Sequence, residues 1–265
     1  MSIIICPVCG EELKEENRSL ICTNGHCFDR AREGYVNLMA GNRKNGSLIG
    51  DNRAMALSRR AFLEKGYFDS LLQELIGIIK DKALPCPDIL DICCGEGYYS
   101  HRIREAVSCR MYGFDISKEM VRLAAKRKND CEYLVANLAR IPVKDKSVDI
   151  AFHLFAPFHE KEFSRIMKDG GTLITVVAGE NHLYELKEIL YDTPYKNDER
   201  PPGTQKLTVR EKRKVSAKIH LSSREEINAL FEMTPYYYRT GDRDKAKLSA
   251  HEQLDVTVEF CIFIY

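Results

Sequence analysis

The chain has 265 residues, which is enough for one large domain and a small additional module. Hydrophobic residues make up 44% of it, and 40 Lys and Arg nearly balance 39 Asp and Glu, which excludes wholesale disorder and a uniformly cationic surface. No apolar run approaches the roughly 18 residues of a membrane span, and the apolar start is too short for a signal peptide. We therefore expect a cytoplasmic protein without membrane contact, whose ten cysteines are reduced thiols or metal ligands.

The beginning of the chain holds a cluster of candidate metal ligands. Cys6 and Cys9 form one short ligand turn, and Cys22 and His26 form a second turn, with twelve residues between the two pairs. Zinc prefers four nitrogen or sulfur ligands in a tetrahedron, and a module too small for an apolar core can fold around such an ion. The pattern predicts a structural zinc site, because four protein ligands leave no open position for catalysis. Cys27 is an alternative to His26 at the fourth position.

After this cluster the chain changes character. Residues 41–52 are rich in polar residues and Gly, which predicts a flexible connection, and the apolar spacing over 54–80 predicts two helices interrupted near Gly66. From residue 87 onward, strands and helices alternate. We expect strands at 89–94, 111–115, 132–136, 148–154, 172–178, 215–221 and 256–265, and helices at 98–107, 118–127 and 223–233. This alternation is typical of an α/β fold with a doubly wound, parallel sheet.

A glycine loop follows the first strand of this sheet. Gly95-Glu96-Gly97 comes after Asp91 and opens the next helix, so the backbone can approach a ligand closely at the carboxyl edge of the strands. Asp115 ends the second strand, where a carboxylate can accept both ribose hydroxyls of a cofactor. NAD enzymes share such a loop, but the acidic Asp91, and Ser100 in place of a third Gly or Ala, favour S-adenosylmethionine.

Longer motifs accompany these features along nearly the whole chain. They are Cys6-x-x-Cys9, Cys22-x3-His26-x-Phe28-Asp29, Glu33-Gly34-Tyr35-Val36-Asn37-Leu38, Arg59-Arg60-Ala61-Phe62-Leu63, Gly95-Glu96-Gly97-Tyr98-Tyr99, Ala156-Pro157, His182-Leu183-x-Glu185-Leu186-Lys187 and Met233-Thr234-Pro235. In this combination the sequence resembles the RlmA-type methyltransferases, which methylate N1 of a guanine in 23S ribosomal RNA. The resemblance implies a class I methyltransferase (Rossmann-like) fold, S-adenosylmethionine as methyl donor, and an N-terminal zinc module that helps to grip an RNA hairpin.

The resemblance also implies roles for single residues. The zinc ligands of the family match Cys6, Cys9, Cys22 and His26, which leaves Cys27 as a bystander. The family's contacts to S-adenosylmethionine match Tyr67, Gly95, Glu96 and His182. One departure is Cys93, where the family usually carries Gly, so this loop is stiffer and bulkier at its first turn. We accordingly expect a zinc-binding RNA-recognition module at 1–36, a linker and helical segment at 37–80, and an S-adenosylmethionine-dependent methyltransferase domain at 81–265.

The chemistry requires a base, because guanine N1 carries a proton at neutral pH that has to leave before or during methyl transfer. The weak candidates around the end of the fourth strand are His153, His159 and Glu160. His153 can equally be a strand-end residue without a catalytic role. Phe155 and Pro157 are candidate walls for a base removed from its stack, with ordinary core packing as the alternative.

Two further polar features lie near the predicted site. Asn137 follows the third strand, where it can contact the adenine of the cofactor or form a turn. Tyr236, Tyr237 and Tyr238 are predicted to lie on a loop, with at least one of them exposed and available for stacking, because three adjacent tyrosines cannot all face one core.

Cations gather in two segments in spite of the balanced total. Residues 28–65 contain eight Lys and Arg against four Asp and Glu, and the expected RNA contacts there are Arg30, Arg32, Arg59 and Arg60. A second basic run over 206–218 can bind phosphate or form a solvated face.

We therefore expect methyl transfer from S-adenosylmethionine to N1 of a guanine in a 23S rRNA hairpin, by a protein with structural zinc that can act as a homodimer. One alternative keeps the fold and cofactor but acts on another RNA, a protein or a small molecule. Another is a non-enzymatic zinc RNA-binding protein, motivated by Cys93, and an NAD oxidoreductase is the least favoured.

Overall fold

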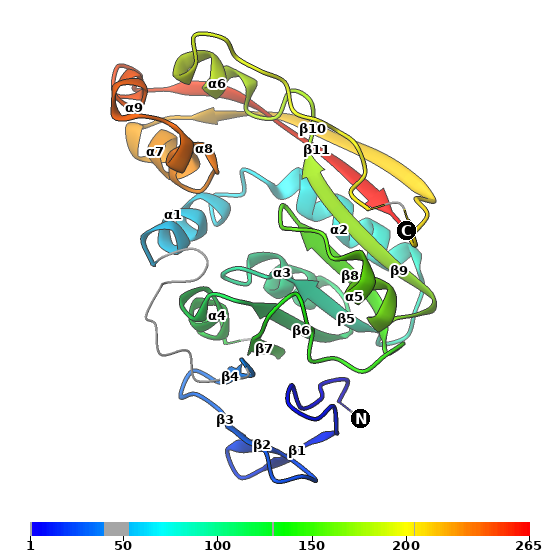
Figure 1. Ribbon diagram of the computed structural model, residues 1–265. Helices are drawn as coiled ribbons and strands as arrows, with labels where there is room; N and C mark the ends of the chain where they lie inside the picture. Colours follow the sequence, from blue (N-terminus) through cyan, green and yellow to red (C-terminus); the bar gives the residue numbers. More distant parts are fainter. Residues whose placement is uncertain (1, 40–52, 129, 204) are drawn as a thin grey trace.

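The computed structural model describes residues 2–39, 53–128, 130–203 and 205–265. Over these residues the chain forms an eight-stranded sheet in the order β10-β11-β9-β8-β5-β6-β7-β4 and a three-stranded sheet near the N-terminus (Figure 1). The strands of the main sheet are β4 (Val36–Asn37), β5 (Asp88–Ile92), β6 (Arg110–Asp115), β7 (Cys131–Val135), β8 (Val148–Leu154), β9 (Met167–Ala178), β10 (Glu211–Leu221) and β11 (Leu254–Ile264). The connection predicted at 41–52 lies outside the described residues.

The main sheet is parallel over most of its width. β6 and β8 both pair with β5 in parallel, and β7, β4 and β9 continue this part outward. The predicted α/β sheet is confirmed, but its far side is mixed, because β11 runs antiparallel to both β9 and β10. The chain runs outward from β5 through β6 and β7 and then returns to β8 on the other side of β5. This reversal opens a crevice at the carboxyl ends of β5 and β8, where such sheets bind ligands.

Helices cover both faces of the sheet. They are α1 (Arg53–Leu63), α2 (Asp69–Asp81), α3 (Tyr98–Ala106), α4 (Lys118–Ala125), α5 (Glu160–Ile166), α6 (Tyr184–Leu190), α7 (Arg224–Glu232), α8 (Tyr236–Arg239) and α9 (Asp242–Leu248). Gly66 has a φ of +78° between α1 and α2, which agrees with the predicted interruption. The loop predicted at Tyr236 is wrong: this residue begins α8, because Pro235 before it already has the helical φ of −61°.

The alternation of side chains along β8 separates two cores. Phe152 lies in the core that includes α2 and α3, whereas Ala151 lies in the core that includes Phe163 of α5. No helix in the described ranges is both long enough and apolar enough to cross a membrane.

The N-terminal module is a small antiparallel sheet of β1 (Leu13–Glu16), β2 (Ser19–Cys22) and β3 (Cys27–Asp29), drawn in blue below the main sheet in Figure 1. It docks on the main domain through a bridge between Ile4 and Val143. β4 then adds two residues to the edge of the main sheet beside β7, so this strand spans the boundary predicted between residues 36 and 37. The three-part division of the chain stays a prediction.

Candidate functional site

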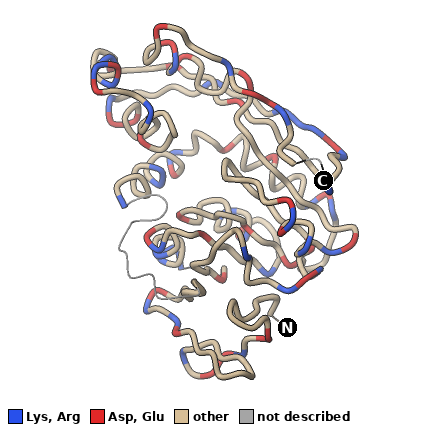
Figure 2. The backbone as a smooth tube through the Cα atoms, in the orientation of Figure 1, with Lys and Arg blue, Asp and Glu red and all other residues tan. Residues whose placement is uncertain are grey.

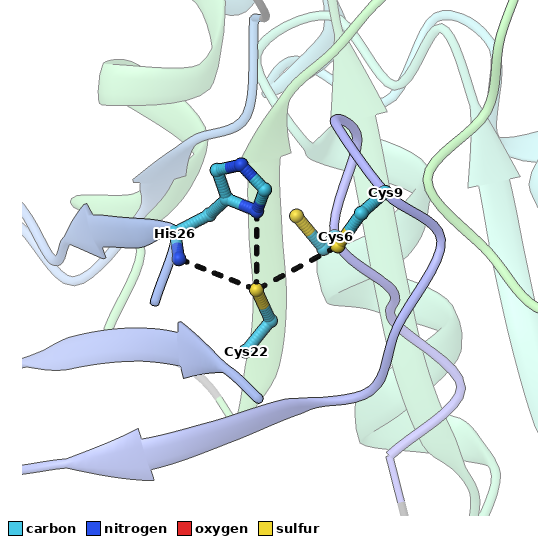
Figure 3. Close-up of side chains that lie close together, drawn as sticks. All are labelled: Cys6, Cys9, Cys22 and His26. Atoms are coloured by element: carbon cyan, nitrogen blue, oxygen red, sulfur yellow. Dashed lines mark hydrogen bonds between the residues drawn. The ribbon is translucent and has the colours of Figure 1, made fainter. Parts of the chain in front are cut away.

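The predicted zinc ligands come together in the N-terminal module (Figure 3). One ligand atom from each of Cys6, Cys9, Cys22 and His26 lies within 4.8 Å of all the others. The sulfur atoms of Cys9 and Cys22 are 3.7 Å apart, close to the roughly 3.8 Å between two thiolates that share a tetrahedral zinc ion. Nδ1 of His26 lies 3.3 Å from the Cys22 sulfur, whereas Cys27 is exposed and lies outside the cluster. The geometry fits a closed site with four protein ligands.

Two glycine turns shape this site. The Gly10 N–H donates to the Cys6 carbonyl oxygen at 2.9 Å, and the Gly25 N–H donates to the Cys22 carbonyl oxygen at the same distance. Both glycines have positive φ values, +82° and +78°, which L side chains rarely adopt. The two turns hold Cys6 and Cys22 so that they face each other. The short spacing of the ligands in the sequence therefore produces the local geometry of the cluster.

A cavity of about 860 Å³ opens at the carboxyl ends of β5, β6 and β8. Its volume lies in the range of cofactor and substrate pockets. The residues of the sequence-predicted sites that line it are Arg59, Asp91, Gly95, Glu96, Asp115, His153, Phe155, Pro157 and His182. Residues far apart in the sequence close the cavity on the other side, among them Asn197, Pro202 and Tyr238.

The glycine loop turns sharply below this cavity. Cys93, Gly95 and Gly97 have φ values of +59°, +56° and +78°. A Cβ atom at Gly97 would lie 2.7 Å from the Cβ of Ala124 in α4, so only Gly lets the start of α3 pack this closely. Cys93 adopts a left-handed conformation that costs an L residue roughly 1–2 kcal/mol. This strain is the physical reason why a glycine suits the position and Cys93 is a departure.

Three carboxylates line the cavity around this loop. Asp91 is 2% exposed, and burial raises the pKa of its carboxyl to about 8, although Ser100 donates a hydrogen bond to it. Asp115 accepts hydrogen bonds from the Gly95 N–H at 3.0 Å and the Ser117 N–H at 2.8 Å. The carboxylate of Asp115 can attract the sulfonium and ammonium groups of S-adenosylmethionine.

Glu96 is held by a buried ion pair with Arg127, and the two side chains are 1% and 3% exposed. Arg127 also donates to the Glu96 backbone oxygen at 3.0 Å and to Glu64, which follows α1. Burial raises the pKa of the Glu96 carboxyl, and the charge of Arg127 opposes that effect. The pair thus ties α1 and α4 to the glycine loop.

Several buried polar atoms of the lining have no hydrogen-bond partner within the described part of the chain. They are Glu96 Oε1, Tyr99 Oη, His153 Nδ1 and Thr175 Oγ1. A buried polar group without a partner costs about 1–3 kcal/mol, so native proteins retain such groups where a ligand or water satisfies them. These atoms fit a cavity that is completed by a polar cofactor and substrate.

The two histidines of the cavity are neutral. Nε2 of His153 lies 2.9 Å from the Pro157 carbonyl oxygen, which can only accept, so Nε2 carries the proton and Nδ1 presents a lone pair. Nδ1 of His182 accepts the Glu259 N–H at 3.2 Å, so its proton is also on Nε2. Burial lowers the pKa of His153 to about 4 and that of His182 to about 3.

Five of the predicted cofactor and catalytic residues lie outside the cavity lining: Gly97, and Tyr67, Asn137, His159 and Glu160 with side chains that are held elsewhere. The Tyr67 hydroxyl hydrogen-bonds to Glu226, and Oδ1 of Asn137 accepts the Ala139 N–H in a turn. His159 caps α5 through a hydrogen bond from the Glu162 N–H at 3.3 Å. Glu160 accepts the N–H groups of Lys206 and Leu207 at 2.6 and 2.9 Å. All four side chains have structural partners here, and their proposed contacts stay predictions.

The predicted RNA-contacting arginines lie in different surroundings. Arg59 lines the cavity, Arg60 does not, and Arg32 is exposed on the N-terminal module. Arg30 pairs with Glu132 at 3.2 Å and donates to the Gly34 oxygen. In Figure 2, Lys and Arg segments are interspersed with Asp and Glu segments along the backbone. Three of the six cations in the basic run at 206–218, namely Lys212, Arg213 and Lys214, form ion pairs, which favours the solvated-face interpretation for this part of the run.

Comparison with known proteins agrees with both sites. Residues 4–47 match the family described as RlmA, N-terminal, and residues 89–171 match the one described as methyltransferase domain. A 23S rRNA (guanine(748)-N(1))-methyltransferase of Streptomyces fradiae is 35% identical over 189 residues, which are 70% of this chain and 66% of that protein. A Bacillus subtilis (strain 168) protein with the provisional name 23S rRNA (guanine-N(1)-)-methyltransferase YxjB is 30% identical over 281 residues.

The second relative matches nearly end to end, since the alignment covers 99% of this chain and 96% of that protein. The methyltransferase domain implies S-adenosylmethionine as cofactor, and the zinc ribbon with its Cys/His cluster implies structural zinc. The chain therefore belongs to the RlmA-type 23S rRNA (guanine-N1-)-methyltransferase family.

Proposed function

We propose that this protein transfers the methyl group of S-adenosylmethionine to N1 of a guanine in a hairpin of 23S rRNA. The observation that carries the proposal is the exposed aromatic ring of Phe155 at the cavity that also contains the glycine loop. Phe155 is 48% exposed and has a φ of +53°, a conformation that costs energy in a non-glycine residue. An exposed ring at a cavity can stack on a target base that has left its own stack and entered the pocket.

Other rings extend this surface. The rings of Phe155 and His182 are stacked with centroids 6.3 Å apart and an interplanar angle of 21°. Tyr238, which is 63% exposed, lines the same cavity from α8. We infer that the guanine stacks on Phe155 and that Pro157 forms a wall beside it, since unpaired bases bind to aromatic and apolar faces.

His153 is the residue that we propose as acceptor of the N1 proton. Its Nδ1 lone pair is buried, has no partner among the described residues and lies in the cavity lining. The neutral ring can take a proton at Nδ1 while Nε2–H remains bonded to the Pro157 oxygen. His159 and Glu160 are weaker candidates, because their side chains are engaged at α5 and with the 206–207 backbone.

The cofactor, when bound, supplies a methyl group that is already activated by its sulfonium. The chain's own residues then have to align guanine N1 with that group and exclude water. We propose that Asp115 binds the ribose hydroxyls and that Gly95, Gly97 and the acceptor Oε1 of Glu96 border the methionine end. Tyr67, Asn137 and His182 stay proposed cofactor contacts.

Mass mapping tests the proposal. Zinc-loaded protein is incubated with S-adenosylmethionine and 23S rRNA from cells that lack the gene, and the RNA is digested and analysed for 1-methylguanosine. We expect one new methylated guanine in a hairpin. Phe155→Ala should reduce turnover on RNA while cofactor binding is kept, and Phe155→Tyr, which retains the ring, should restore turnover.

Methylation of a protein or small molecule, with none on RNA, would overturn the substrate assignment. Lack of cofactor binding in calorimetry would instead support a non-enzymatic RNA-binding protein. We also propose that the protein works in the cytoplasm and binds its RNA as a homodimer, which light scattering with and without the RNA hairpin can test.

A further inference from the structure

One face of α1 borders the cavity although the resemblance assigns no cofactor role to this helix. Met55, Arg59 and Leu63 all line the cavity, and each is four residues from the next. Residues at this spacing lie on the same face of a helix. The side chain of Arg59 is therefore the central member of a stripe that faces the cavity. Arg60, about 100° further round the helix, is not among the lining residues.

The guanidinium of Arg59 lies over the glycine loop. A Cβ atom built at Gly95 would be 3.4 Å from Nη1 of Arg59. Contacts from the middle of α1 and from the residue after it hold the helix in this place: Ser58 donates to Glu232 of α7 at 2.5 Å, and Glu64 binds Arg127, which also holds Glu96. The position of Arg59 relative to the loop thus follows from packing between segments far apart in the sequence.

The charges of the lining are complementary to an amino acid. Glu96 and Asp115 provide carboxylates, and the cations of the lining are Arg59 and Arg239. The methionine end of S-adenosylmethionine carries an ammonium and a carboxylate, and the carboxylate needs a cationic partner. Arg59 is the lining cation that lies against the glycine loop, whereas Arg239 belongs to α8 and its charge acts on Tyr195 and Tyr236.

We propose that Arg59 binds the α-carboxylate of the cofactor's methionine moiety, instead of an RNA phosphate. The inference rests on the proposed function only in taking S-adenosylmethionine as the ligand. An arginine suits this role, because its planar guanidinium matches a carboxylate with two parallel hydrogen bonds. The two neighbouring arginines of α1 then have different roles: Arg59 binds the cofactor, whereas Arg60, which does not line the cavity, stays a predicted RNA contact.

The test compares two ligands that differ only in the α-carboxylate of the methionine moiety. Calorimetry with the zinc-loaded full chain measures the dissociation constants of S-adenosylmethionine and of decarboxylated S-adenosylmethionine, which keeps the sulfonium and the ammonium. Arg59→Gln should weaken binding of the complete cofactor about tenfold or more, the range for a lost charge-assisted hydrogen bond. Binding of the decarboxylated cofactor should stay within about twofold of the wild-type value.

Arg60→Gln and Arg239→Gln are the matched controls, and both should bind the two cofactors as the wild type does. Equal weakening of both cofactors by Arg59→Gln, or no weakening, would overturn the proposal, and so would a selective loss in Arg239→Gln. Arg59→Lys, which keeps the charge, is measured if Arg59→Gln fails to fold, and it should retain part of the preference for the carboxylate. Failure of the wild type to bind either cofactor would count against the proposed function instead.

Discussion

Replacing Gly97 by Ala should destabilise the cofactor-free protein, because two separate costs meet at this residue. Its φ of +78° lies in the left-handed region, which costs an L residue roughly 1–2 kcal/mol. The added Cβ would also lie 2.7 Å from the Ala124 Cβ and 3.1 Å from its Cα, and such overpacking costs typically about 1–3 kcal/mol. We expect the free energy of unfolding to fall by about 2–5 kcal/mol in total.

Gly95→Ala is the matched control, since Gly95 has a similar φ of +56° but no atom closer than 3.4 Å to an added Cβ. The nearest atom to its added Cβ is the end of the flexible Arg59 side chain at 3.4 Å. The difference between the two variants therefore isolates the contacts of Gly97 with Ala124 in α4 and with the Tyr133 hydroxyl, which would lie 2.8 Å from the added Cβ. Any entropy that Ala removes from the unfolded chain is common to both variants and cancels.

Urea unfolding followed by far-UV circular dichroism, with zinc at saturation and no cofactor, measures both variants. The chain has no Trp, so circular dichroism is preferable to fluorescence. Gly97→Ala should unfold at lower urea than Gly95→Ala, with a difference of about 1–3 kcal/mol. Equal midpoints, or a more stable Gly97→Ala, would refute the close packing of this glycine against Ala124.

Two further predictions concern zinc and pH. Cys6→Ser should release the bound zinc and unfold the N-terminal module while the main sheet persists, because metal binding and folding are coupled in such modules. Metal analysis measures the zinc content, and amide hydrogen exchange measures the unfolding of the module. A variant that retains its zinc would contradict the ligand set. Burial raises the pKa of the Asp91 carboxyl in the folded protein from 3.8 to about 8. The folded state therefore binds this proton more tightly than the unfolded state, and the resulting stabilisation is lost as the pH rises from about 4 to about 8. The wild type should thus lose stability with rising pH relative to Asp91→Asn in urea titrations, and parallel pH profiles of the two proteins would show that the carboxyl is not buried in this way.

Local patterns in the sequence predicted the zinc cluster and the glycine loop between a strand and a helix. Cys6 and Cys9 lie on one turn, and Cys22 and His26 on another, so the spacing alone places two pairs of ligands. Gly95 and Gly97 likewise mark a loop whose conformation depends on a few adjacent residues. Such features are predictable because their geometry is set within about one turn of chain.

The surroundings of several candidate side chains could not be predicted in this way. His159 and Glu160 follow β8 by only a few residues, yet they cap α5 and bind the backbone of 206–207. Tyr67 binds Glu226, which is far away in the sequence. Proximity in the sequence to a strand end therefore did not determine which side chains line the cavity.

By itself the sequence determined the class of fold, the ligand spacing of the zinc module and the glycine loop with its flanking carboxylates, because each of these is encoded by residues close together in the chain. Only the tertiary structure decided that Arg59 lies against Gly95, that His153 has a buried lone pair, and that β11 runs antiparallel beside β9. These features depend on packing between distant segments, where many side chains compete for the same space and no local pattern records the outcome.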